Sequence, residues 1–265
     1  MSGIKLARAL EVAQTAARAA GRFIQDSRQR VRNAVVEHKS PADVAGSIER
    51  EAESLIRTRI AAVFPEHGFV GSELGGSFDA RRAQWLIDAI DAGANYRYGY
   101  PHYAVSIGLQ HQGEVVLGVI YDPNRDELFT ATRGQGAFCN GARIACSIRS
   151  RTADALAATV FPAPSSERMP QYVAEVGRMV AGFGSVHRSG AVALELAYLA
   201  AGRIDAFWAH EMGDWDAAAA IVLVREAGAR FESLDRAPLL ASHELLAATP
   251  SVFTAARSIL LNAAA

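Results

Sequence analysis

The hydrophobic pattern of this 265-residue chain changes its period along the sequence, and that change limits the folds open to it. Residues 4–28 and a segment beginning near Ser47 carry apolar side chains at helical spacing, which predicts two long N-terminal helices. Between residues 103 and 144 apolar residues alternate with polar ones between turn residues, which is typical of an antiparallel meander. After about residue 155 the predicted strands and helices alternate, as they do in an α/β layer.

This order predicts two halves in one compact structural unit. Residues 1–155 are expected to form an N-terminal α+β lobe with an antiparallel sheet, and residues 156–265 a C-terminal α/β lobe. The stretch from 160 to 170 contains the sequence Phe-Pro-Ala-Pro-Ser-Ser and is the best candidate for the connection between the halves, because such clusters mark loops. Ligand sites often lie at junctions of this kind.

Two acidic residues follow a short apolar run that begins at Trp85. The run predicts a buried strand that delivers Asp88 and Asp91 to a turn at its C-terminal end. Asp216 stands where a later helix is expected to begin. Carboxylates aimed at one point repel each other and are costly to desolvate unless a cation or a proton joins them. Their hard oxygen ligands suit Mg²⁺ better than zinc or copper.

Helix capping or surface solvation would explain each of these aspartates taken alone. Their joint occurrence with Trp85 and Trp215 favours a shared metal site. Apart from His210, the histidines (His38 among them) show no paired metal spacing and are interpreted as surface or core residues. Lys39 is interpreted as lying at the surface or just behind the ligands of the site. His210 stands just past a predicted strand end, where it could contact substrate, although an exposed loop is the simpler interpretation.

Composition narrows the classes of partner and compartment. The 27 Lys and Arg residues nearly balance the 28 Asp and Glu residues, so neither nucleic acid nor an anionic membrane is the expected partner. No apolar run is long enough to cross a bilayer. Cys139 and Cys146 lack zinc-ligand or redox spacing and are expected to be free thiols, and the N-terminus does not read as a signal peptide. A cytoplasmic protein is therefore expected.

The two acidic segments also carry a family resemblance. The run Trp-Leu-Ile-Asp-Ala-Ile-Asp at residues 85–91, with Asn-Tyr at 95–96, resembles the first signature of the inositol monophosphatase-type sugar phosphatases. The sequence Trp-Asp-Ala-Ala-Ala at 215–219 resembles the second, and the glycine-rich segment 134–141 matches the family hairpin. The likeness extends over essentially the whole chain. It implies a layered αβαβα sandwich, usually dimeric, and a Mg²⁺-dependent phosphatase of small phosphorylated polyols or sugars.

The resemblance also implies roles for individual residues. Asp88 would bridge two metal positions, Asp91 and Asp216 would complete the second, and the carbonyl of Ile90 would assist. The phosphate and the rest of the substrate would lie against a further group of residues. These substrate-binding residues would be Ala92, Gly93 and Ala94, and His210 is added to them because of its place just past a predicted strand end.

Several positions depart from the family pattern, and most of them fall in the predicted site. Ser72 stands where the family has a carboxylate ligand, and Gly93 stands where a threonine orients the attacking water. Ala209 replaces a substrate-contacting glutamate. Glu49 is one methylene longer than the family aspartate. Because these changes weaken the first metal position, we expect metal binding with slow or absent hydrolysis unless Glu73 or Glu49 substitutes for the missing carboxylate.

Two functions therefore remain open. The first is a Mg²⁺-dependent phosphomonoesterase in which Glu49, Glu73 and Gly93 belong to the catalytic apparatus. The second is a binding or regulatory protein that keeps the fold and a partial metal site but has lost turnover. A purely structural homodimer has no sequence feature in its favour.

Overall fold

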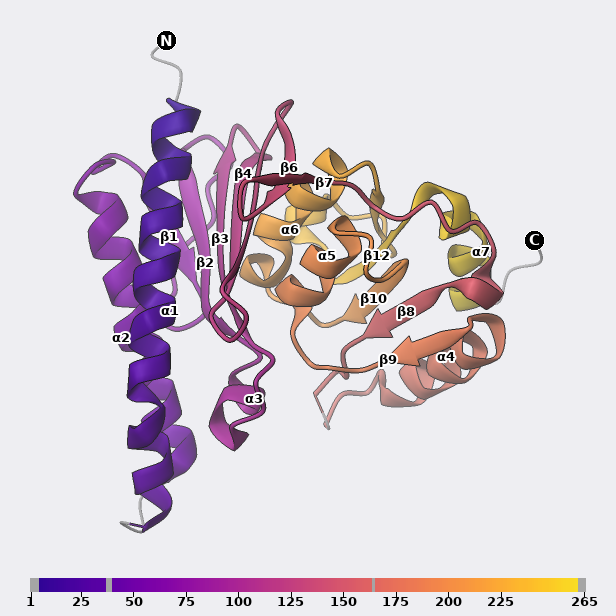
Figure 1. The fold of residues 1–265 in the computed structure, drawn as a ribbon, viewed down its shortest axis with the longest axis horizontal. Helices are drawn as coiled ribbons and strands as arrows, with labels where there is room; N and C mark the ends of the chain where they lie inside the picture. The colour runs from indigo at the N-terminus through magenta and orange to yellow at the C-terminus, as the bar shows by residue number, and fades with distance from the viewer. Residues whose placement is uncertain (1–4, 37–39, 164, 262–265) are drawn as a thin grey trace.

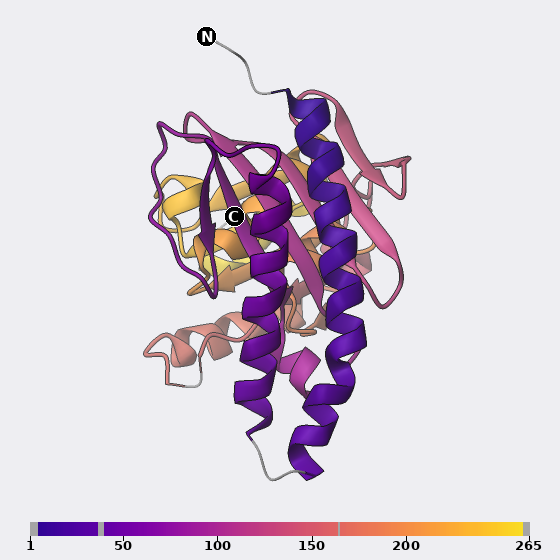
Figure 2. The same cartoon turned by 90° about the vertical axis from the view of Figure 1, so that its left-hand side faces the viewer.

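The computed structural model describes residues 5–36, 40–163 and 165–261. Two long helices, α1 (Leu6–Val36) and α2 (Pro41–Ala61), form the first of five layers (Figures 1 and 2). The start of α2 is encoded locally. The Ser40 side chain accepts a hydrogen bond from the Asp43 amide (3.2 Å), and Pro41 occupies the first turn, where its missing N–H is not needed.

A seven-stranded sheet forms the second layer, and α1 and α2 cover one of its faces. Its strands follow the chain order from edge to edge, β1 and β2 being parallel and all later pairs antiparallel. The short helix α3 (Gly93–Tyr98) follows β2. The strands are β1 (Gly68–Gly71), β2 (Gln84–Asp91), β3 (Ala104–His111), β4 (Glu114–Asp122), β5 (Glu127–Thr132), β6 (Gly136–Cys139) and β7 (Ala142–Ile144).

Helices α5 (Val192–Ala200) and α6 (Asp214–Glu226) form the middle layer, between the two sheets (Figure 1). Glycines on β3 and β4 allow α6 to lie close to the first sheet. A Cβ added to Gly108 would be 2.9 Å from the Ala218 methyl, and one added to Gly118 would overlap the Ala219 carbonyl. This close approach fixes the height of α6, and thus of its N-terminal turn, above the sheet.

The fourth and fifth layers are a five-stranded mixed sheet and the helices α4 (Met169–Gly182) and α7 (Pro250–Leu261) on its outer face (Figure 1). Single 3₁₀ turns lie at Thr152–Asp154 and Leu239–Ala241. The strands, in their order across the sheet, are β11 (Arg230–Ser233), β12 (Glu244–Ala248), β10 (Ala206–His210), β8 (Leu156–Thr159) and β9 (Ser185–His187).

The layered αβαβα sandwich expected from the resemblance is thus confirmed, and so is the meander. Two boundaries differ from the expectation, since α1 continues to Val36 and α2 begins at Pro41 rather than near Ser47. The connection was placed wrongly: β8 already pairs with β10, so residues 145–155 join the two sheets, and the 160–170 stretch only leads from β8 to α4. The division into lobes at residue 155 stays a prediction. No helix in the described part of the chain is long and apolar enough to span a membrane.

Candidate active site

A cleft of about 310 Å³ lies where the ends of β2, β10 and α6 meet. Every predicted site residue except the exposed Ala94 lines it. The cleft therefore gathers side chains from both halves of the chain. Its lining residues are Glu49, Ser72, Glu73, Asp88, Ile90, Asp91, Ala92, Gly93, Val160, Phe161, Gly190, Val192, His210, Glu211, Met212 and Asp216.

Strand β2 supplies the first two acidic groups. All eight of its residues are buried, and its register with β3 shifts between Asp88 and Asp91, so the strand is irregular where the acidic residues lie. The Asp88 carboxylate accepts a hydrogen bond from the Ile90 amide (3.1 Å). This short-range contact holds Asp88 against its own strand and faces it toward the cleft.

Asp91 joins the two halves of the molecule. Its carboxylate oxygens accept hydrogen bonds from the amides of Val192 (3.0 Å), Ala193 (2.9 Å) and Leu194 (3.3 Å), which form the first turn of α5. Amides in a first turn have no partner within their helix, and a carboxylate satisfies them well. Asp91 therefore caps α5 from a strand about one hundred residues earlier in the chain.

Asp216 lies in the first turn of α6, as predicted. Its carboxylate accepts a hydrogen bond from the Gly213 amide (2.9 Å), and its own amide donates to the Gly213 carbonyl (3.1 Å). These reciprocal contacts fix the turn that leads from β10 into α6.

Burial raises the pKa of all three aspartates. Burial, together with the charges of Asp216 and Asp91, raises the pKa of Asp88 well above its usual range. Burial and the charge of Asp216 raise the pKa of Asp91 to about 8, against the opposing effect of the α5 amides. Burial also raises the pKa of Asp216 to about 6. Such a group favours a proton or a cation among its carboxylates.

The donor set suits a hard divalent cation, but the side chains are not arranged as a ready-made site. Among the residues that the structure describes, no three acidic, histidine or cysteine side chains converge as metal ligands. Hydrogen bonds to backbone amides hold two of these carboxylates, that of Asp91 at the first turn of α5 and that of Asp216 at the first turn of its own helix, α6. The metal roles of Asp88, Ile90, Asp91 and Asp216 stay predictions.

Glu49 and Glu73 form a carboxyl pair at the edge of the cleft. Burial, the charge of Glu73 and a hydrogen bond with Glu73 raise the pKa of Glu49 to about 7. Arg50 pairs with the Glu73 carboxylate from the other side (3.3 Å). A pKa near 7 is a property of groups that transfer protons, so Glu49 is a candidate for that role.

The segment after Asp91 holds a strained residue. Ala92 has left-handed backbone angles (φ 70°, ψ 51°), which cost a residue with a Cβ about 1 kcal/mol and cost glycine almost nothing. A Cβ added to Gly93 would overlap the Glu49 carboxylate, so a side chain at this position would require Glu49 to move. Ala94 is exposed on α3, so any contact it makes with a substrate would come through its backbone.

The expected exposed loop at His210 was wrong. His210 is the last residue of β10, its side chain is 2 % exposed, and its Nε2 lies 2.7 Å from the Glu175 carboxylate on α4. The strand ends two residues later than predicted and carries His210 into the interior. His210 still lines the cleft, although its ring is paired with Glu175 on the outer layer.

Comparison with known proteins agrees with this architecture. The sequence profile of the Inositol monophosphatase family matches residues 5–262. The chain belongs to this family. It is 37 % identical over 212 residues to an inositol-1-monophosphatase of Rhizobium meliloti, covering 79 % of each protein. It is 38 % identical over 224 residues to the Nus factor SuhB of Pseudomonas aeruginosa, covering 83 % of each.

Solved structures of the family superimpose on the whole fold. The extragenic suppressor protein suhB from Bartonella henselae is 33 % identical, with a TM-score of 0.86 over 96 % of this chain and 98 % of that one. The inositol monophosphatase from Anabaena is 30 % identical, with a TM-score of 0.84 over 98 % and 97 % of the two chains. Family membership thus supports a phosphatase-type site in the cleft.

Two contributors to this family site were missed in the sequence. Glu53 is fully buried, although a glutamate on a helix usually indicates a solvated face. Its carboxylate accepts hydrogen bonds from the amides of Glu73 (2.9 Å) and Leu74 (3.2 Å) and pairs with Arg57 (2.5 Å). It therefore shapes the turn that carries Ser72 and Glu73. The Glu53–Arg57 spacing of four residues was the available signal.

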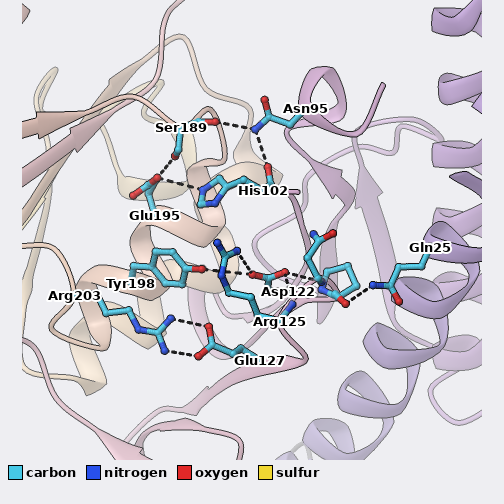
Figure 3. A network of polar contacts seen from close by, with 12 residues as sticks. Gln25, Asn95, His102, Asp122, Arg125, Glu127, Ser189, Glu195, Tyr198 and Arg203 are labelled. Carbon is cyan, nitrogen blue, oxygen red and sulfur yellow. Dashed lines mark hydrogen bonds and ion pairs between the residues drawn. The ribbon is translucent and has the colours of Figure 1, made fainter. Parts of the chain in front are cut away.

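The second missed contributor is a polar network across the halves (Figure 3). Asn95 donates hydrogen bonds to the carbonyls of His102 (2.7 Å) and Ser189 (2.8 Å), and the Glu195 carboxylate contacts both the Ser189 hydroxyl and His102 (3.3 Å to its Nε2). The network holds the start of α5 beside the acidic turn.

Lys39 and His38 lie outside the described residues.

Proposed function

We propose that the protein is a Mg²⁺-dependent phosphomonoester hydrolase that acts on a small phosphorylated polyol or sugar, with weakened turnover. The observation that carries the proposal is the group of Asp88, Asp91 and Asp216, which line one cleft and all have raised pKa values. Membership in a family with relatives named inositol-1-monophosphatase supports the same reaction class.

In this proposal Asp88, Asp91, Asp216 and the Ile90 carbonyl would hold the cation. When bound, Mg²⁺ would neutralise the phosphate and activate its attack by water. The Glu49–Glu73 pair, with a pKa of about 7 for Glu49, can accept a proton from a water molecule in the cleft. Backbone amides of Ala92, Gly93 and Ala94 would contact the phosphate, which is their predicted role. His210 would act behind the substrate rather than on it, because its ring faces Glu175.

The direct test measures phosphate release from inositol 1-phosphate and a panel of sugar phosphates at millimolar Mg²⁺. We expect measurable turnover that needs the cation and that falls at least about 10²-fold in Asp88→Asn. The variant Ser72→Glu, which restores a carboxylate at the weakened position, should raise turnover. Activity that is equal in wild type and Asp88→Asn, or indifferent to Mg²⁺, would refute the proposal.

A second candidate is a catalytically inactive binding or regulatory protein. Two residues favour it, since Ser72 lacks the carboxylate and Gly93 lacks the hydroxyl that the family resemblance places at these positions. In addition, several relatives are named Nus factor SuhB. Retained Mg²⁺ binding without turnover on any substrate of the panel would select this function.

Light scattering would test the homodimer that we also expect. A cytoplasmic location and the absence of a nucleic-acid partner stay predictions.

A further inference from the structure

A buried charged cluster lies directly behind the cleft. The imidazole of His210 stands between two carboxylates, with Nε2 2.7 Å from Glu175 and Nδ1 3.4 Å from Glu244. The side chains of His210 and Glu175 are 2 % and 4 % exposed, and that of Glu244 is 13 % exposed. Arg168 pairs with Glu244 at the outer side (2.5 Å). The cluster therefore runs from a buried carboxylate through the imidazole and a second carboxylate to a guanidinium at the surface.

The members of the cluster come from three separate elements. His210 ends β10 and is the cross-strand neighbour of Glu244 on β12, and Glu175 reaches it from α4 in the outer layer. Removing His210 alone would leave the buried Glu175 carboxylate without its imidazole partner, and a buried charge that loses its partner is among the most costly changes in a protein interior. The cluster therefore holds the end of β10 against both β12 and α4.

Only three residues separate this anchored strand end from α6. Glu211 has left-handed backbone angles (φ 57°), and its carboxylate accepts a hydrogen bond from the Ser166 hydroxyl (2.6 Å). The Met212 amide donates to the His243 carbonyl (3.2 Å), and His243 Nδ1 lies 2.6 Å from the Met212 carbonyl. A non-glycine residue keeps such a backbone only when the surrounding contacts over-determine it.

We infer that His210, held by Glu175 and Glu244, is a positioning residue for Asp216. The anchored end of β10 sets where the strained turn begins, and the Gly213–Asp216 contacts set where it ends. The inference rests on the proposed function for the role of Asp216 in cation binding. The order of the turn itself does not depend on that function.

The test uses the double variant Glu175→Leu/His210→Leu in the full-length protein. It replaces the buried carboxylate and its imidazole partner together by apolar side chains, an exchange that is often neutral or stabilising for the fold. We expect a folded protein in which the amides of residues 211–216 exchange hydrogen faster than in wild type. We also expect about tenfold weaker binding of Mg²⁺, measured by calorimetry without substrate, as is typical when a residue that orients a ligand is lost.

Asp205→Asn is the matched control. Asp205 is equally buried and pairs with Arg149 (2.9 Å), but it precedes the opposite end of β10. The control should lower the melting temperature and leave both the exchange of residues 211–216 and Mg²⁺ binding unchanged. If the double variant does not fold, His210→Gln replaces it, with a smaller increase in exchange expected.

Unchanged exchange at residues 211–216 in a folded His210 variant would overturn the inference. So would an equal increase in the Asp205→Asn control. A wild-type protein that hydrolyses no phosphomonoester would remove the proposed function, and the exchange comparison would still decide whether His210 orders the turn.

Discussion

The carboxylate of Glu49 lies over the α-carbon of Gly93 and occupies the space that a side chain at position 93 would need. Two departures from the family pattern therefore complement each other in space, because a longer acidic side chain on α2 meets a residue without a side chain on α3. The same carboxyl group is hydrogen bonded to Glu73. The two altered positions of the site thus pack against each other, with the Glu49 carboxylate filling the space beside Gly93.

This relationship predicts coupling between positions 49 and 93. Gly93→Thr should displace the Glu49 side chain from Glu73 and lower activity, since the Glu49 carboxylate fills the space of the new side chain. Glu49→Asp in the same protein should recover part of the loss. A double-mutant cycle on kcat/KM should give a coupling energy of about 1 kcal/mol. Strict additivity of the two single variants would contradict the packing described here.

Asp88→Asn should make the protein without cation more stable while it removes function. The substitution deletes one of several repelling buried carboxylates and keeps the side-chain oxygen that accepts the Ile90 amide. We expect the free energy of unfolding in EDTA to rise by about 1 kcal/mol or more. Urea titrations monitored by fluorescence would measure it, with the exposed Asp26→Asn as a control that should change little.

The stability of the cation-free protein should fall as the pH rises from about 4 to about 8. Asp91, Asp216 and Glu49 have folded-state pKa values of about 8, 6 and 7, above their unfolded values. The folded state therefore binds more protons in this window, and each group removes up to about 1.4 kcal/mol per pH unit while it titrates. Melting curves in EDTA should show this trend, and millimolar Mg²⁺ should reduce it. A cation-free protein most stable at pH 8 would contradict the carboxylate assignment.

Ala92→Gly should stabilise the protein by about 1 kcal/mol. Glycine adopts the left-handed backbone of position 92 without strain, whereas alanine does not. Ala94→Gly provides the control two residues later, because Ala94 is exposed within α3 and its replacement should destabilise by about 0.5–1 kcal/mol. Chemical denaturation of both variants measures the two changes in the free energy of unfolding. Changes of the same sign would argue against strain at Ala92.

Gly118→Ala should destabilise the fold by about 2 kcal/mol or more, because its methyl would overlap the Ala219 carbonyl of α6. The displaced helix carries Asp216, so activity should fall as well. Gly177→Ala on α4 is the matched control, since a Cβ there meets no atom within 4 Å and alanine favours a helix. The control should be stabilising and should keep wild-type activity.

Periodicity was sufficient to predict the layers, because each half-buried element must present one apolar face. It placed α2 too late, since its first turn carries no apolar stripe and is specified instead by the Ser40 cap and Pro41. It also ended β10 at Trp208, because nothing local reveals that His210 has carboxylate partners on α4 and β12. Long-range partners of single polar residues are not encoded in a local pattern.

Asp88, Asp91 and Asp216 were predicted from the sequence pattern, and Glu49 and Glu73 from the family resemblance. The structure brings all five to one cleft. The buried Glu53 was not predicted, because a glutamate on a helix gives the same local signal whether water or a protein amide satisfies it. Nor could spacing predict that both carboxylate oxygens of Asp91 would accept hydrogen bonds from the amides of α5. That contact depends on how the second half of the chain docks on the first.

The α5 cap has a mechanical implication. Since a single carboxylate on β2 closes the first turn of α5, any motion that parts the sheets must also fray that helix. A cation that pulls the Asp91 carboxylate away from the α5 amides would weaken the contact between the two halves when it binds in the cleft. Cation binding in the cleft would then make the layered fold less rigid, because both depend on the side chain of Asp91.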